Sequence, residues 1–314
     1  MTSVLFDVPG PKARRFSLIV SIIALVLILA GAFWVYTLLA APRDSGGITL
    51  PGMFDGSRWD IFLDPEVWGS IGRGVVATLQ AAALAAVGAM ILGVILSLMR
   101  SSSNPWLRVP TGWLIEFLRG MPVLLMMLFI LLVASTGAFW AVVIALILYN
   151  GTLIGEILRA GLVALPRGQR EAALSVGMRE FQSKILVEFP QAFRQMLPII
   201  VAQLVVLLKD TSLGYIVGYS EIIRNNMNGL GSFYGNRYAF SLFVVTLLIY
   251  LAINLTLSWF ARWLSRRTAS GGARGRRKGR AVDPTAPGAL LEVEAKADRM
   301  AAGKGMGQYD GTAT

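Results

Sequence analysis

Two long apolar runs are separated by residues 165–190, LPRGQREAALSVGMREFQSKILVEFP. The interpretation of the whole chain depends on this stretch. It is polar, whereas the chain of 314 residues is 55% hydrophobic and only 15% charged. A soluble domain carries about 25% charged residues. The chain therefore has the composition of a membrane protein, and the polar segment inside it needs a separate explanation.

Runs of about 20 apolar residues are long enough to cross a bilayer as helices. The sequence contains six such runs, at residues 17–41, 69–98, 113–135, 138–158, 197–219 and 238–264. The first is too long for a signal-peptide core and ends in no clear cleavage pattern, so we expect it to be a retained extra helix. The predicted fold class is an all-α polytopic membrane protein with about six transmembrane helices.

Basic residues predict the orientation of these helices, because Lys and Arg are enriched in cytoplasmic segments. With both termini inside, the cytoplasmic segments hold 22 Lys and Arg and the external segments, 42–68 and 221–237, hold 4. Residues 1–16 are then a cytoplasmic N-terminus. Residues 265–314 form a basic cytoplasmic tail that cannot bury enough apolar area to fold alone. Its basic run is expected to lie on anionic membrane lipid.

The composition excludes several function classes. The chain has no Cys and no His, which removes disulfides, zinc thiolate sites and His-based catalysis, and we expect no metal site. The net charge of +11 is spread between apolar runs and the tail, which argues against nucleic acid as a partner. No P-loop is present, so we expect no ATP binding by this chain.

The polar stretch predicts two short helices with a glycine joint. Pro166 suits the first turn of a helix, and Gly177 suits the position just after its end, where a left-handed conformation is needed. The following MREFQSKILVEF predicts a second helical stretch, which we expect Pro190 to stop. From composition alone, the stretch is equally consistent with a surface linker between two spans.

The spacing of seven positions in this stretch resembles the EAA loop of ABC importer permeases. That family has EAA, three residues, Gly, nine residues, Ile, one residue, Leu and Pro. This chain departs from the pattern with Val187 for Ile and Phe189 for Leu, both of which are apolar. By this resemblance the coupling residues are Glu171, Ala172, Ala173, Gly177, Val187 and Pro190.

The resemblance extends over about residues 69–264, the five-helix permease core, and is specific to the polar amino-acid branch of type I importers. Met121 replaces the Thr that is usual in the RGTP segment of that branch. The N-terminal VLFDVPGPKARR, residues 4–15, resembles actinobacterial glutamate permeases. The matching segments are GVVATL at 74–79, EFLRGMP at 116–122, EILRAG at 156–161, PRGQ at 166–169 and LKDTSL at 208–213.

The resemblance implies a permease subunit in the bacterial cytoplasmic membrane, which is not itself an enzyme. A second permease, either a sister subunit or a second copy, completes the translocation path. An ABC ATPase dimer uses ATP and Mg, and an extracellular solute-binding protein delivers the substrate. The loop 161–198 docks on the ATPases. The implied substrate is a polar amino acid, with glutamate first and glutamine or aspartate next.

Polar residues within the apolar runs are candidates for the substrate path or a gate, because an ionisable group in a membrane usually faces a cavity or a partner. Lys209 and Asp210 lie about 12 residues into the run 197–219. Residues 197–208 alone are too short to span a membrane, so we expect the helix to continue past the two charges. Each charge then needs a partner on another helix or subunit. An ion pair that holds the bundle together is the alternative. The candidates are Lys209, Asp210, Thr211, Ser212, Asn150 and Gln203.

Two other function classes stay open. An intramembrane enzyme would have to work without His and Cys, and the embedded Asp of this chain has no carboxylate partner nearby in the sequence. A passive channel or an ion-coupled carrier would purify without an ATPase. Small residues crowd the run 69–98, and close helix packing is the expected reason.

Overall fold

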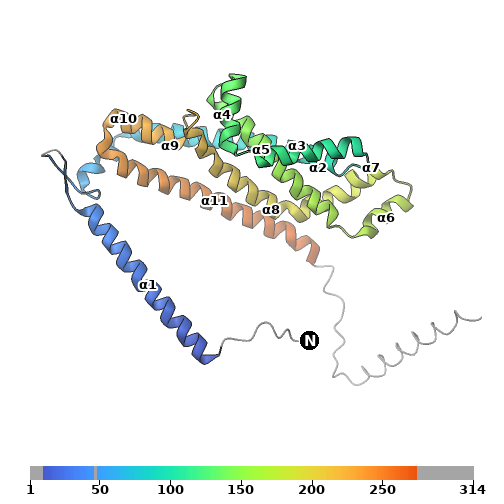
Figure 1. Cartoon of the computed structure of the whole chain (residues 1–314), viewed down its shortest axis with the longest axis horizontal. Coiled ribbons are helices and arrows are strands. Elements are labelled where there is room, and N and C mark those ends of the chain that lie inside the picture. The colour runs from blue at the N-terminus through green and yellow to red at the C-terminus, as the bar shows by residue number, and fades with distance from the viewer. Residues whose placement is uncertain (1–9, 46–47, 274–314) are drawn as a thin grey trace, which may run out of the picture. The chain divides into compact units, whose positions relative to one another are not determined.

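The computed structural model describes residues 10–45 and 48–273, so the first nine residues and most of the predicted basic tail lie outside the described part. The chain divides into two units, Met1–Trp263 and Leu264–Thr314. Almost all described residues are helical (Figure 1). The longer elements are α1 (Pro11–Ala40), α2 (Pro65–Arg100), α3 (Pro105–Gly120), α4 (Val123–Ala134), α5 (Ala138–Val163), α6 (Arg167–Ser175), α8 (Phe189–Asp210) and α11 (Ala239–Ala273).

Short elements connect these helices. An antiparallel hairpin, β1 (Arg43–Ser45) and β2 (Ile48–Leu50), and two 3₁₀ turns, Gly56–Arg58 and Asp60–Leu63, occupy the predicted external loop 42–68. The remaining elements are α7 (Glu180–Gln182), the π-helical turn η3 (Ser183–Glu188), the 3₁₀ turn η4 (Thr211–Tyr215), α9 (Ile222–Arg224), the π-helical turn η5 (Asn225–Leu230), α10 (Gly231–Tyr234) and the 3₁₀ turn η6 (Asn236–Tyr238).

The predicted all-α polytopic fold is confirmed. Within the described residues, five helical segments are long and apolar enough to cross a membrane, and six when the bent pair α3–α4 counts as one span. The first predicted run forms one continuous helix, α1, whose apolar segment has no buried residue in the single chain. Such an all-round apolar, exposed helix suits a lipid environment.

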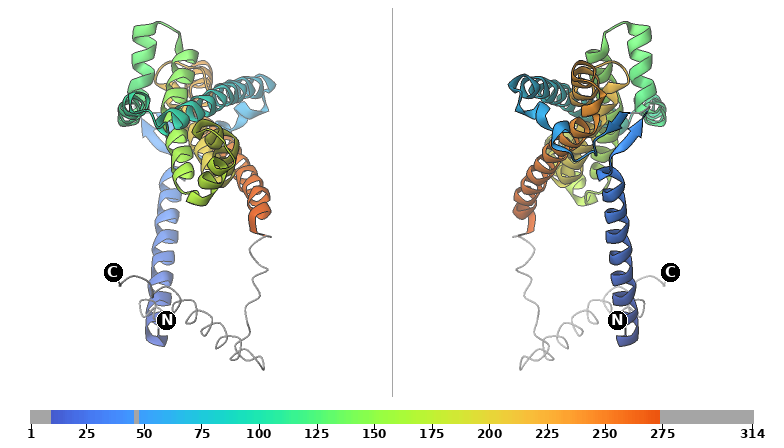
Figure 2. Two further views of the ribbon diagram at one scale, coloured as in Figure 1. Left: turned by 90° about the vertical axis from the view of Figure 1, so that its right-hand side faces the viewer. Right: turned by 90° about the vertical axis from the view of Figure 1, so that its left-hand side faces the viewer.

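The third predicted run, residues 113–135, is not one continuous helix but lies across the bent pair α3–α4. Helices α3 and α4 meet at an angle of 100° (Figure 2). The break falls at Met121, whose backbone is extended at φ −85° and ψ 126°, directly before Pro122. The proline ring clashes with a helical residue before it, so Gly120-Met121-Pro122 ends one helix and starts another.

Helices α2 and α5 form the centre of the bundle and approach each other closely. A Cβ atom added at Gly93 would lie 2.7 Å from Ile154 Cγ2, and one at Gly151 would lie 2.8 Å from Leu92 Cδ2. Four alanines of α2 are buried as well, at Ala81, Ala82, Ala85 and Ala89. The predicted close packing of this run is confirmed, since small residues let two helix backbones approach.

Helix α8 differs from the predicted span 197–219 at both ends. It begins eight residues earlier, at Phe189, and ends at Asp210, where the 3₁₀ turn Thr211–Tyr215 takes over. Its 22 residues rise about 33 Å at 1.5 Å each, which is enough to cross the hydrocarbon core. The helix therefore does not need to continue past Lys209 and Asp210, which lie in its last turn.

Candidate functional site

The segment 165–190 forms the predicted short helix and leaves most of that helix exposed. Pro166 is the N-cap of α6 rather than its first helical residue. Glu171 and Ala172 are exposed, whereas Ala173 is buried, with 7% of its surface accessible. Since α6 contacts η3, Ala173 faces the chain itself and leaves Glu171 on the open side. The face of α6 with Ala173 therefore packs inside the chain, and the face with Glu171 remains available to a partner.

Gly177 ends α6 in the left-handed conformation that the sequence predicts, with φ +85°. The N–H of Gly177 donates to Leu174 O at 3.0 Å, and the N–H of Met178 donates to Ala173 O at 3.2 Å. These two bonds form a Schellman motif, which satisfies the last carbonyl groups of the helix. Backbone conformation rather than space requires glycine here, because a Cβ atom added to Gly177 would meet nothing within 4 Å.

Pro190 does not stop the second helical stretch, contrary to the prediction. The chain passes from η3 into α8 without a break, and Pro190 lies in the first turn of α8. A proline is tolerated there because its missing N–H is not needed in a first turn. The wider π-turn brings the N–H of Phe189 to Lys184 O instead. Val187, in this turn, is half-buried and Pro190 is exposed.

Side chains brace the loop against the connection between α2 and α3. Arg170 pairs with Glu180 at 2.7 Å, and Ser103 Oγ donates to the same carboxylate at 2.5 Å. Lys184 Nζ donates to Ser101 O. About half of each side chain in the Arg170–Glu180 pair is exposed, so the pair orients the loop more than it stabilises the fold. Sequence spacing could not reveal the contacts with Ser101 and Ser103, since they join residues about 80 positions apart.

The polar residues after Leu208 form a second cluster at the other end of α8. Thr211 is fully buried; its Oγ1 donates to Leu208 O at 2.7 Å and lies 3.1 Å from Tyr250 Oη on α11. Ser212 Oγ donates to Lys209 O at 2.8 Å. Within the described residues, neither Lys209 nor Asp210 forms an ion pair. The alternative interpretation, an ion pair between helices, is therefore not seen among the described residues of the single chain.

A cavity of about 250 Å³ lies beside this cluster. Lys209 and Ser212 line it together with Tyr250 and Thr246 of α11, and the rest of its wall is apolar. Few polar groups in an apolar wall are typical of small-molecule sites. Tyr250 and Thr246 were missed by sequence reasoning, because single polar residues in an apolar run give no periodic signal. The apolar lining residues are Ile223, Met227, Phe243 and Leu247.

Asn150 and Gln203 bind each other and do not line this cavity. Gln203 Nε2 donates to Asn150 Oδ1 at 2.9 Å, and Asn150 Nδ2 donates to Leu146 O at 3.1 Å. Asn150 has no accessible surface. The pair joins α5 to α8 in the interior, so in this structure it is an interhelical contact.

The matched segment 74–79 forms a junction with the residues after α8. A Cβ at Gly74 would lie 2.9 Å from Ile222 Cα, so glycine allows the α9 backbone to pack directly on α2. Thr78 Oγ1 accepts the N–H of Ile222 at 3.1 Å and donates to Gly74 O at 2.9 Å. Tyr219 Oη donates to Ala77 O at 2.7 Å. The segment therefore holds Tyr219 and the start of α9 against α2.

Glu221 is a buried carboxylate that the sequence analysis treated only as part of an external segment. It caps α9, accepting the N–H of Ile223 at 3.0 Å and of Arg224 at 2.8 Å. Burial raises its pKa above the usual value, and these two hydrogen bonds act in the opposite direction. An acidic residue directly before a short helical segment is the signal that could have identified this cap.

Comparison with known families agrees with this architecture. The family described as "Binding-protein-dependent transport system inner membrane component" matches residues 87–270. A glutamate transport system permease protein of Corynebacterium glutamicum is 37% identical over 233 residues, which cover 71% of this chain and 84% of that protein. A probable glutamine ABC transporter permease of Bacillus subtilis is 33% identical and covers 62% of this chain and 91% of that protein.

Solved structures give the same fold. An amino acid ABC transporter crystallised with histidines is 29% identical, with a TM-score of 0.58, covering 64% of this chain and 95% of that one. A methionine ABC transporter in an inward-facing conformation has a TM-score of 0.56 at 16% identity, which shows the fold alone, and covers 65% of this chain and 99% of that one. The chain therefore belongs to the inner membrane components of binding-protein-dependent transport systems, as a multi-pass permease subunit of an amino-acid ABC importer.

Proposed function

We propose that this permease imports glutamate, with glutamine or aspartate as the next candidates. The Corynebacterium relative, at 37% identity, is a glutamate permease, whereas other relatives are named for glutamine and for glutamate with aspartate. The cavity beside α8 supports an acidic substrate, because Lys209 supplies a cation in a mostly apolar wall. A carboxylate in such a setting gains most from a charged hydrogen-bond donor.

One observation carries the mechanism: α6 presents an exposed face, and beyond the turn at Gly177 a continuous helical segment, Glu180–Tyr215, runs to the polar cluster. Glu171 and Ala172 lie on this face, and the Schellman motif at Gly177 fixes where the helix ends. We assign this face the contact with an ATPase subunit. Val187 and Pro190 then belong to the turn that transmits the contact into α8 rather than to the contact itself.

The polar cluster at the end of α8 is the proposed lining of the substrate path or a gate. Lys209 and Ser212 reach the cavity, and Thr211 ties the cluster to Tyr250 of α11. Asp210, half-buried and without an ion-pair partner among the described residues, is the group that a second permease subunit would meet. The hydrogen bond between Asn150 and Gln203 holds α8 against α5 and does not belong to this lining.

The complete importer then contains this chain, a second permease subunit, an ABC ATPase dimer and an extracellular solute-binding protein. ATP and Mg bind to the ATPase, because this sequence has no P-loop. A sister permease is the expected second subunit, and a second copy of this chain is the alternative.

The test is purification of the chain in mild detergent from its own host, followed by reconstitution with the proteins that co-purify. We expect an ATPase in the complex, and ATP-dependent uptake of labelled glutamate that unlabelled glutamate suppresses more strongly than glutamine, aspartate or arginine. Uptake without an ATPase would indicate a channel or a carrier. Stronger suppression by another amino acid would correct the substrate and leave the importer mechanism intact.

A further inference from the structure

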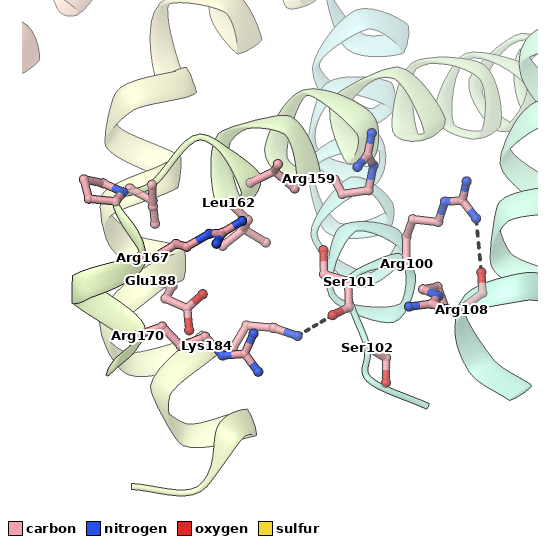
Figure 3. A pocket seen from close by; sticks show the side chains of 13 residues that line it. Arg100, Ser101, Ser102, Arg108, Arg159, Leu162, Arg167, Arg170, Lys184 and Glu188 are labelled. Atoms are coloured by element: carbon pink, nitrogen blue, oxygen red, sulfur yellow. Dashed lines mark hydrogen bonds between the residues drawn. The ribbon is translucent and has the colours of Figure 1, made fainter. Parts of the chain in front are cut away.

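An open cavity of about 320 Å³ lies among the helix ends around the α6 loop, at the opposite end of α8 from Lys209 (Figure 3). Its outstanding property is positive charge. Six basic side chains from five elements line it: Arg100 of α2, Arg108 of α3, Arg159 of α5, Arg167 and Arg170 of α6, and Lys184 of η3. These residues are spread over about 85 positions of the sequence, so the sequence alone does not show that they meet.

The carboxylates around the cavity neutralise only part of this charge. Glu156 pairs with Arg159 at 2.9 Å and lies 3.9 Å from Arg100. Arg170 pairs with Glu180. Glu188, the acidic residue in the lining, accepts a hydrogen bond from Ser183.

Three of the six cations form no ion pair within the described residues: Arg108, Arg167 and Lys184, whose Nζ donates to Ser101 O instead. Arg108 and Arg167 are both exposed. They come from α3 and α6, on either side of the cavity, and Figure 3 shows the Arg167 side chain extending into the space between these walls. Like charges facing one another across an open space favour an anion between them.

Part of the wall is apolar. Leu162, Val163 and Leu165 line the cavity beside the arginines, and Val163 is 73% exposed. They lie where α5 ends, close to the end of α2 at Arg100. Both helices are membrane-span candidates, and the wall lies at the ends of both. A free inorganic anion would gain nothing from the apolar surface, whereas a lipid would cover it.

We propose that this cavity binds the phosphate headgroup of an anionic membrane lipid. The guanidinium groups of Arg108 and Arg167 bind the phosphate oxygens, since arginine matches phosphate geometry with paired N–H donors. The glycerol and first acyl carbons cover Val163 and Leu165. A lipid held this way joins α3 to α6 and thereby braces the loop. The site does not depend on which amino acid is transported.

Native mass spectrometry of the full-length chain tests this directly. The probes are phosphatidylglycerol, phosphatidylcholine with the same acyl chains, and inorganic phosphate. We expect one phosphatidylglycerol to be retained more strongly than phosphatidylcholine. In an Arg108→Gln/Arg167→Gln variant we expect that retention to weaken roughly 30-fold, the factor for two lost cation contacts at a membrane surface. An Arg108→Lys/Arg167→Lys variant should recover much of it.

The matched control is an Arg179→Gln/Arg194→Gln variant, which loses the same charge from exposed positions outside the cavity. Its phosphatidylglycerol retention should equal that of the unaltered chain. Equal weakening in both variants would show that only overall charge matters and would overturn the site, as would equal retention of both lipids. If inorganic phosphate alone bound with the same dependence on Arg108 and Arg167, the cavity would be a free-phosphate site and the lipid assignment would be wrong.

Discussion

Glycine is essential in two regions of this molecule for opposite physical reasons. Between α2 and α5, Gly93 and Gly151 are buried, and a side chain at either position would meet atoms of the facing helix within 3 Å. In the loop, Gly177 is exposed with open space around it, yet its φ of +85° strains any other residue. The first region uses glycine for contact, and the second uses it for conformation.

This difference separates stability from coupling. Damage to the α2–α5 contact removes packing from the centre of the bundle, where cores tolerate added volume poorly. Damage at Gly177 leaves the core untouched, because nothing packs on that position. Substitutions in the two regions should therefore produce different phenotypes, one in the amount of folded protein and the other in transport.

The largest expected effect is that of Gly93→Leu. The new side chain would collide with Ile154 and with the carbonyl oxygen of Gly151, at a cost of ~3 kcal/mol or more. We expect the detergent-solubilised protein to aggregate or to unfold at a much lower temperature, as measured by size-exclusion chromatography after heating. Gly72→Leu, in the same helix with nothing within 4 Å, is the control and should behave like the unaltered chain. Equal damage at both positions would mean that helix propensity, rather than contact, decides.

Gly177→Arg tests the other half of the comparison. A non-glycine residue in the left-handed region costs about 1–2 kcal/mol, and we expect the Schellman motif to rearrange while the bundle stays folded. Uptake in reconstituted vesicles and substrate-stimulated ATP hydrolysis should fall to background, with thermal stability nearly unchanged. Gly168→Arg, on α6 and also in open space but without a positive φ, separates the effect of backbone strain from that of the added bulk and charge. Normal uptake by Gly177→Arg would remove the assigned role of the loop.

A smaller effect is expected where α5 meets α8. Asn150→Leu removes the acceptor of Gln203 Nε2 and should cost ~1 kcal/mol or somewhat more, because a partly buried donor is left unpaired. The double variant Asn150→Leu/Gln203→Leu should be closer to the unaltered chain in thermal stability than Asn150→Leu alone. Additive losses in the double variant would show that the two side chains do not act as a pair.

The smallest effect concerns the external end, where Tyr234 Oη donates to Asp64 Oδ2 at 2.6 Å. The hydrogen bond from Tyr234 lowers the pKa of Asp64 from 3.8, and the same contact raises the pKa of Tyr234 from 10.0 to about 12. The hydrogen bond therefore contributes its full stabilisation between pH 3.8 and pH 10.0, the ordinary pKa values of the two groups. It is lost below pH 3.8, as Asp64 takes up a proton, and above pH 10.0, as Tyr234 ionises near pH 12.

Thermal unfolding of Tyr234→Phe across pH measures this contact. Its stability deficit relative to the unaltered chain should be constant near neutral pH and should shrink toward both extremes. Tyr36→Phe removes a hydroxyl from a tyrosine that stacks on Phe54, and should show no such pH dependence. A deficit of the same size at every pH would assign the effect to packing instead.

The sequence predicted the helical bundle well because long apolar runs are a strong signal. It also predicted the left-handed Gly177 and the small-residue contact on α2, since both are local properties of residue type. It did not predict the helix break before Pro122, and it predicted a helix end at Pro190 where the helix continues. A proline near a helix start is tolerated and one preceded by an extended residue is a break, and which applies depends on where the helix begins.

The interior partners could not be predicted. Tyr250 and Thr246 join Lys209 around one cavity only because α11 packs beside α8. The Asn150–Gln203 pair spans 53 positions. Such contacts depend on the rotation of each helix about its axis, which an all-round apolar run leaves undetermined.

Helix α8 begins at the turn after the loop and ends at the polar cluster, and it stays helical through Pro198 over about 33 Å. Such a rod acts as a lever whose arm is fixed by its length. A tilt of about 5° about its loop end would carry Lys209 sideways by about 3 Å, which is roughly the width of a water molecule. A small angular displacement at the cytoplasmic end is therefore sufficient to open or close a hydrogen-bonded constriction at the other end, without any residue in between changing its neighbours along the helix.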